Sequence, residues 1–144
     1  MNLDSVGKKL TGMAKKITAA KGRLELLGLF LREDSPDLWD LVIAAPWLKA
    51  DERASFEYVA SELREALANE ELAGLSRIVI LEHGGAALQS FLESFRSHAG
   101  LADVHFVTEG GAIIRKAYII TAYPVVDAAA RRKTKKRRRG KANL

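Results

Sequence analysis

Apolar residues in the first 31 positions recur every three or four residues, the spacing that places side chains on one face of a helix. The positions in this stripe are Leu3, Val6, Leu10, Met13, Ile17, Ala20, Leu24, Leu27 and Leu31. The pattern predicts one long helix whose first part, residues 1–21, is basic, amphipathic and frayed, because each interior glycine costs roughly 1 kcal/mol relative to alanine. Residues 22–31 are expected to pack on the rest of the domain. Such a stripe is also typical of helices that pair, so a homodimer is one hypothesis.

Short apolar runs and amphipathic segments alternate further along the chain. Continuous apolar runs bounded by turn residues, such as residues 34–37 and Pro46, predict strands, and apolar residues on one face predict helices. The predicted strands are residues 38–44, 77–82, 104–108 and 113–122, and the further helices are residues 51–69 and 86–98. Paired glycines at Gly110 and Gly111 predict a tight hairpin between the last two strands.

The predicted order is helix, strand, helix, strand, helix, strand, strand. Strands joined by helices favour right-handed crossovers and parallel pairing. We therefore expect an α/β domain, residues 1–127, with a small, mostly parallel sheet of about four strands and helices packed on it. The last strand is expected to be antiparallel through the hairpin.

The net charge of +5 is unevenly distributed along the chain. Residues 131–141 contain nine basic residues and no acidic residue, which leaves 14 basic and 18 acidic residues, a net charge of −4, in the rest of the chain. Residues 128–144 also lack the apolar side chains that a folded segment must bury, so they are predicted to form a disordered tail.

A block of positive charge attracts polyanions by releasing their counterions. The basic residues of the tail are Arg131, Arg132, Lys133, Lys135, Lys136, Arg137, Arg138, Arg139 and Lys141. No aromatic residue interleaves with them, so nucleic-acid binding through the tail is expected to be non-specific. A tail that only solubilises the domain is one alternative. Attachment to an anionic membrane surface is another, which the glycines of the first helix disfavour.

Ligands of open α/β sheets bind beyond the carboxyl ends of the parallel strands. This rule predicts a ligand or partner surface at Pro46 and Trp47 after one strand, and at His83, Gly84 and Gly85 after the next. The paired glycines before a predicted helix could present backbone N–H groups to an anion, although no phosphate-binding motif is present. A large aromatic residue such as Trp47 is alternatively a packing residue.

Catalytic chemistry has weaker support in the sequence. No cysteine, no nucleophile motif and no metal-binding histidine spacing is present, so we expect neither a metal site nor a cofactor. The leading hypothesis is a non-enzymatic interaction protein whose domain docks a protein partner or itself while the tail binds nucleic acid. The alternative is a small metal-dependent hydrolase or nuclease in which Asp40, Glu82 and Glu109 converge at strand ends.

The composition also bears on location. The absence of cysteine fits a reducing compartment, and no signal-peptide pattern follows the N-terminal lysines. No segment approaches the ~20 apolar residues of a membrane span. We therefore expect a cytoplasmic protein.

Overall fold

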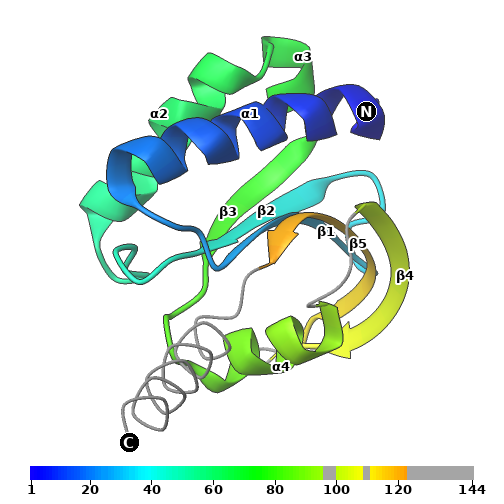
Figure 1. Ribbon diagram of the computed structural model, residues 1–144. Helices are drawn as coiled ribbons and strands as arrows, with labels where there is room; N and C mark the ends of the chain where they lie inside the picture. Colours follow the sequence, from blue (N-terminus) through cyan, green and yellow to red (C-terminus); the bar gives the residue numbers. More distant parts are fainter. Residues whose placement is uncertain (96–99, 109–110, 123–144) are drawn as a thin grey trace, which may run out of the picture.

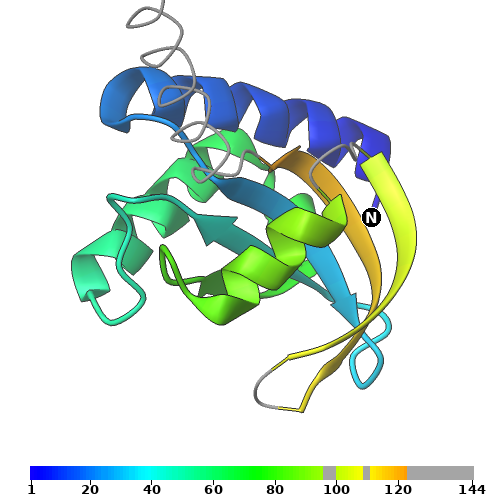
Figure 2. The same ribbon diagram turned by 60° about the horizontal axis from the view of Figure 1, so that its bottom comes forward.

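The domain is a mixed five-stranded sheet with helices on both faces, as a computed structural model that describes residues 1–95, 100–108 and 111–122 shows (Figure 1). The helices are α1 (Leu3–Lys21), α2 (Arg53–Ala66), α3 (Asn69–Leu72) and α4 (Ala86–Phe95). The strands are β1 (Leu26–Arg32), β2 (Trp39–Ala44), β3 (Leu75–Ile80), β4 (Gly100–Val107) and β5 (Ile113–Ala122). Helices α1, α2 and α3 cover one face of the sheet, and α4 covers the other (Figures 1 and 2).

The strands follow the spatial order β3-β2-β1-β5-β4. Only β2 and β3 pair in parallel, whereas β1 pairs with β2 and β5, and β4 pairs with β5, in antiparallel fashion. The prediction of an α/β domain with a final antiparallel hairpin is thus confirmed. The prediction of a mostly parallel sheet of four strands is wrong for two reasons: a hairpin between β1 and β2 adds an antiparallel strand, and β4 lies at the far edge beside β5 and runs against β2 and β3.

The missed strand is β1, which occupies residues expected to continue the first helix. Helix α1 ends before Gly22, whose φ of +115° is a backbone conformation that favours glycine. Strand β1 is the central strand and is buried on both faces, with Leu27 and Leu29 toward α1 and Leu26 and Phe30 toward α4. A strand of this kind is continuously apolar, so its periodicity cannot be distinguished from that of a buried helix.

The apolar stripe of α1 packs within the same chain. Val6, Leu10, Met13 and Ile17 are buried in the core between α1, α2 and the sheet. A second core lies between the sheet and α4, where the ring of Phe91 is stacked on that of Phe30 with centroids 4.5 Å apart. The stripe that motivated pairing of two first helices is therefore occupied by the domain itself.

Ion pairs connect the exposed side of α1 to the next two helices. Lys16 Nζ lies 2.6 Å from Glu65 Oε2 on α2, and Lys9 Nζ lies 2.7 Å from Glu71 Oε1 on α3. The hydrogen bond from Lys16 holds the pKa of the Glu65 carboxyl below its ordinary value and raises the pKa of Lys16. Lys9, Lys16 and Glu65 are open to solvent whereas the Glu71 side chain is 16% exposed, so the Lys16–Glu65 pair in particular adds little to the stability of the domain.

The two glycines inside α1 have different surroundings. A Cβ atom added at Gly7 would lie 2.5 Å from the hydroxyl oxygen of Tyr118 on β5, whereas one added at Gly12 would have no atom within 4 Å. We expect Gly12→Ala to raise the free energy of unfolding by about 0.5–1 kcal/mol, since alanine restricts the unfolded chain and favours the helix. Gly7→Ala should bring no such gain because α1 must move away from Tyr118. Urea unfolding of both variants measures the difference, and an equal gain at the two positions would contradict this packing.

Candidate functional site

Two polar clusters lie at opposite edges of the sheet. Strands β2 and β3 run in parallel and β1 runs against them, so the end of β1 meets the starts of β2 and β3 at one edge. We call this side the arginine edge, after Arg32, Asp40 and Arg77. The opposite side, which we call the histidine edge, contains Glu25, Glu82 and His83.

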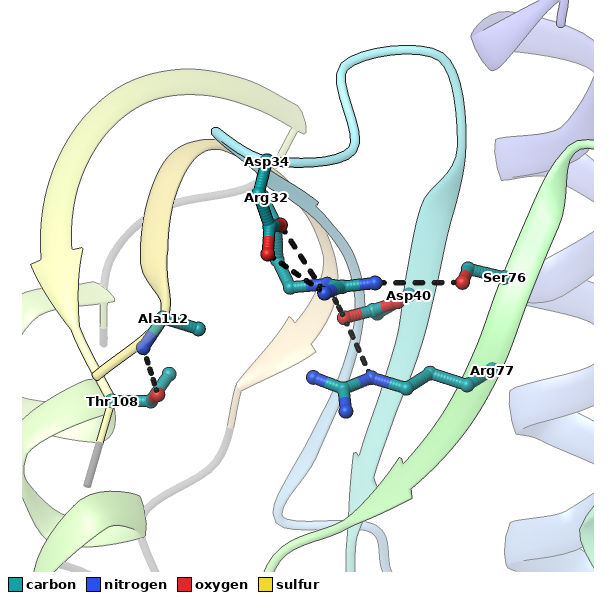
Figure 3. Close-up of polar contacts among 7 residues, drawn as sticks. All are labelled: Arg32, Asp34, Asp40, Ser76, Arg77, Thr108 and Ala112. Carbon is teal, nitrogen blue, oxygen red and sulfur yellow. Dashed lines mark hydrogen bonds and ion pairs between the residues drawn. The ribbon is translucent and has the colours of Figure 1, made fainter. Parts of the chain in front are cut away.

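The arginine edge is organised around a buried carboxylate. Asp40 is only 2% exposed, and its Oδ2 accepts hydrogen bonds from Arg32 Nε at 3.0 Å and from Arg77 Nε at 3.1 Å (Figure 3). The strand register explains this arrangement, because Asp40 and Arg77 are direct neighbours across β2 and β3. Arg32 also contacts Asp34 at 3.2 Å. The other carboxylate oxygen of Asp40 is buried and has no hydrogen-bond partner among the described residues.

A cavity of about 320 Å³ opens beside Asp40, between the sheet and α4. Three polar residues line it, namely Asp40, Arg77 and Thr108. The apolar residues that line it are Phe30, Val42, Val79, Leu81, Ala87, Phe91, Phe106 and Ile114. Thr108 reaches this side of the molecule because β4 runs in the direction of β1. The cavity therefore joins the arginine edge to the aromatic core under α4.

The histidine edge contains a second buried carboxylate, which the sequence analysis missed. Glu25 is buried, and its Oε1 lies 2.8 Å from Nδ1 of His83, whose side chain is 46% exposed. A carboxylate that holds one ring nitrogen of a histidine fixes the orientation of the ring and leaves the other nitrogen for a further contact. The sequence did contain a signal for this contact. Glu25 is a single acidic residue inside the apolar run of residues 24–31, and a carboxylate in a buried run needs a partner.

The residues that follow β3 at this edge either bind the backbone of a neighbouring loop, form the turn into α4 or are exposed. Glu82 Oε1 accepts a hydrogen bond from the backbone N–H of Ala50 at 3.1 Å, so the loops after β2 and β3 do meet, as expected. Gly84 and Gly85 form the turn into α4, and Gly84 has a φ of +77° that favours glycine. Both His83 and Gly84 are exposed.

Trp47 at the same edge is largely a packing residue. Its ring lies edge-on to Tyr58 with centroids 5.7 Å apart and borders the core under α1 and α2, whereas the neighbouring Pro46 is exposed. The indole N–H of Trp47 is buried and has no hydrogen-bond partner in the described part of the chain. Of this pair, Pro46 is therefore the residue that a partner would meet first.

The carboxylates of the hydrolase hypothesis are not brought together. Asp40 belongs to the arginine edge and Glu82 to the histidine edge, while Glu109 lies outside the described residues. A nuclease of this kind usually also needs a lysine, but the two candidates contact other acidic residues: Lys49 pairs with Glu52 at 3.5 Å, and Lys116 lies 4.0 Å from Asp103. Within residues 1–95, 100–108 and 111–122, no three acidic or histidine side chains are grouped as a metal site would require. The basic residues of the predicted tail also lie outside the described ranges.

In comparisons with known proteins, no family model, curated protein or solved structure matches the chain. Among the helices that the structure describes, none is long and apolar enough to cross a membrane.

The arginine edge predicts unequal roles for the two carboxylates that bind Arg32. We expect Asp40→Asn to lower the free energy of unfolding by about 2–4 kcal/mol, because Arg32 and Arg77 would face each other without the buried negative charge. Asp34→Asn is the matched control, since Asp34 binds the same arginine from an exposed position and should cost less than about 1 kcal/mol. Urea unfolding at neutral pH compares them, and equal losses would show that Asp40 does not organise this edge.

Proposed function

We propose that this chain is a non-enzymatic interaction protein whose basic C-terminal tail binds nucleic acid non-specifically, and whose α/β domain docks a second copy of itself. The observation that carries the proposal is the charge pattern: nine basic residues and no acidic residue within residues 131–141, attached to a chain whose other residues sum to −4. Phosphate contacts by lysine and arginine supply most non-specific affinity for nucleic acids.

Two basic residues of the domain support a second, weaker contact with the same polyanion. Lys15 and Arg23 line a hollow of about 610 Å³ between α1 and β5, together with Thr121. Thr121 is followed by Ala122, the last described residue before the tail. The positive charges of Lys15 and Arg23 can add to the binding of a nucleic acid that the tail attracts.

The hydrolase alternative loses its basis in the described residues. Metal-dependent hydrolysis needs two or three carboxylates around one ion. Asp40 is neutralised by two arginines, and Glu82, at the other edge, is bonded to a backbone N–H. No observation therefore favours this function over binding.

The outer edge of β4 supports docking between two copies. No described strand pairs with this edge, and Leu101 and Val107 on β4 are 53% and 55% exposed. Leu101, Asp103, His105 and Val107 alternate with less exposed residues, so they share one side of the strand. In an antiparallel pairing of β4 with a second β4, Leu101 of one copy can meet Val107 of the other on both sides of the irregularity between Asp103 and Phe106, which makes the two ends of the strand complementary.

The tail predicts a steep dependence of nucleic-acid binding on salt. With up to nine phosphate contacts, the logarithm of the duplex affinity should fall against the logarithm of salt concentration with a slope of up to about −8. Replacing the nine basic residues of the tail by glutamine keeps the chain length and should lower the affinity at least tenfold. Fluorescence anisotropy with a duplex and a single-stranded oligonucleotide of unrelated sequences measures both effects.

Replacing Lys15 and Arg23 by glutamine is the control for the domain, and it should weaken binding less than the change to the tail. Unchanged binding after the tail substitution would overturn the role of the tail, as would an affinity that does not change with salt.

The β4 edge predicts a concentration-dependent dimer. Val107→Lys should shift the chain to a monomer, because in a two-fold pairing it puts a charge against Leu101 of the other copy at two symmetric positions. Leu38→Lys removes an exposed leucine from the β1–β2 turn and should leave the dimer unchanged. Sedimentation velocity over a range of concentrations distinguishes the outcomes. A wild-type chain that stays monomeric, or a Val107→Lys variant that dimerises like the wild type, would rule out this docking surface.

A further inference from the structure

The cavity under α4 has the size and lining of a small-molecule site. Ligand pockets typically have volumes of roughly 300–1,000 Å³ and apolar walls with a few convergent polar groups. This cavity measures about 320 Å³, and its apolar lining includes Phe30, Phe91 and Phe106. The ring of Phe91 lies 4.5 Å from that of Phe30 and 4.2 Å from that of Phe106, measured between centroids. This part of the cavity suits a flat aromatic or branched apolar body.

The polar end of the cavity presents donors that the described part of the chain does not use. Arg77 binds Asp40 through Nε alone, and its side chain is 52% exposed. Figure 3 shows both terminal nitrogens of its guanidinium turned away from Asp40. Thr108 Oγ1 accepts a hydrogen bond from the backbone N–H of Ala112 at 3.1 Å, so its hydroxyl hydrogen is left to donate. Arg77 and Thr108, which both line the cavity, therefore offer two guanidinium nitrogens and one hydroxyl that have no acceptor among the described residues.

The charges around these donors select among anions. A guanidinium with two unused nitrogens matches a carboxylate or a phosphate with two parallel hydrogen bonds. Asp40 holds a negative charge 3.1 Å from Arg77 Nε, and it also neutralises Arg32. A doubly charged phosphate would meet this buried carboxylate at short range, whereas a singly charged carboxylate is balanced by Arg77 alone.

We propose that the cavity between the sheet and α4 binds a small organic monocarboxylate. Its apolar body lies among Phe30, Phe91 and Phe106, and its carboxylate pairs with the terminal nitrogens of Arg77 and accepts a hydrogen bond from Thr108. This site lies at the arginine edge, on the face of the sheet opposite α1, so it is independent of the nucleic-acid binding proposed for the tail.

The probe for this site is 3-phenylpropionate, which combines a phenyl ring with one carboxylate. Its binding to the full-length protein is measured by isothermal titration calorimetry, beside 3-phenylpropanol and phenyl phosphate. We expect the carboxylate to bind at least tenfold more tightly than the alcohol, since the alcohol lacks the charge-assisted hydrogen bonds to Arg77. Phenyl phosphate should also bind more weakly than 3-phenylpropionate, because its second negative charge is repelled by the Asp40 carboxylate. No binding of the carboxylate, or equal binding of carboxylate and alcohol, would overturn the proposal.

Two variants locate the site. Arg77→Gln should weaken 3-phenylpropionate at least tenfold, and Ala87→Leu, which fills the cavity from α4 with a good helix former, should weaken it without changing any charge. Arg115→Gln is the control, because Arg115 is a half-exposed arginine that pairs with Glu33 at 3.1 Å outside the cavity. Circular dichroism verifies that each variant is folded. Unchanged affinity in Arg77→Gln or in Ala87→Leu would place the carboxylate elsewhere, and an equal loss in Arg115→Gln would reduce its binding to general charge attraction.

Discussion

The burial of β1 on both faces is the constraint on which the rest of the domain depends. A strand in the centre of a sheet that exposes neither face must be covered twice. In this chain α1 and α2 cover Leu27 and Leu29, and α4 covers Leu26 and Phe30. The two cores, the position of each helix and the mixed direction of the sheet all follow from the insertion of this one strand between β2 and β5.

The same strand connects the two polar clusters. Glu25 precedes its first residue and Arg32 is its last, so one end of β1 leads into the histidine edge and the other into the arginine edge. Each cluster compensates a buried carboxylate with cations or donors from neighbouring elements, which is the general condition for keeping a charge inside a protein. This compensation limits the reactions in which Asp40 can take part, because a carboxylate already bound to arginines is a poor metal ligand. The binding that we propose at the arginine edge uses the terminal nitrogens of Arg77, which are not hydrogen-bonded to Asp40.

Local sequence patterns predict the elements of this domain correctly where they agree with tertiary packing. The apolar run of β2, the β4–β5 hairpin and the amphipathic spacing of α2 and α4 are all set by residues within a few positions of one another, and the structure confirms the elements they predict. The largest error concerned residues 22–31, where a doubly buried strand and a buried helix have the same composition. The direction of β4 was a second error, because β4 runs in the direction of β1 and against β2 and β3. Asp40 and Glu82 are apart for another reason, since β2 and β3 are parallel and Asp40 lies near the start of β2 whereas Glu82 follows the end of β3.

The sequence by itself determined the α/β class, the existence of most helices and strands, and the separation of a basic C-terminal segment from a more acidic chain, because periodicity, turn residues and charge are local properties. Only the tertiary structure decided that α1 packs inward, that Arg77 reaches Asp40, and that Glu25 meets His83. These contacts join residues 37 and 58 positions apart. Their partners are chosen by strand order and register, which local sequence does not specify: the parallel pairing of β2 with β3 places Arg77 beside Asp40.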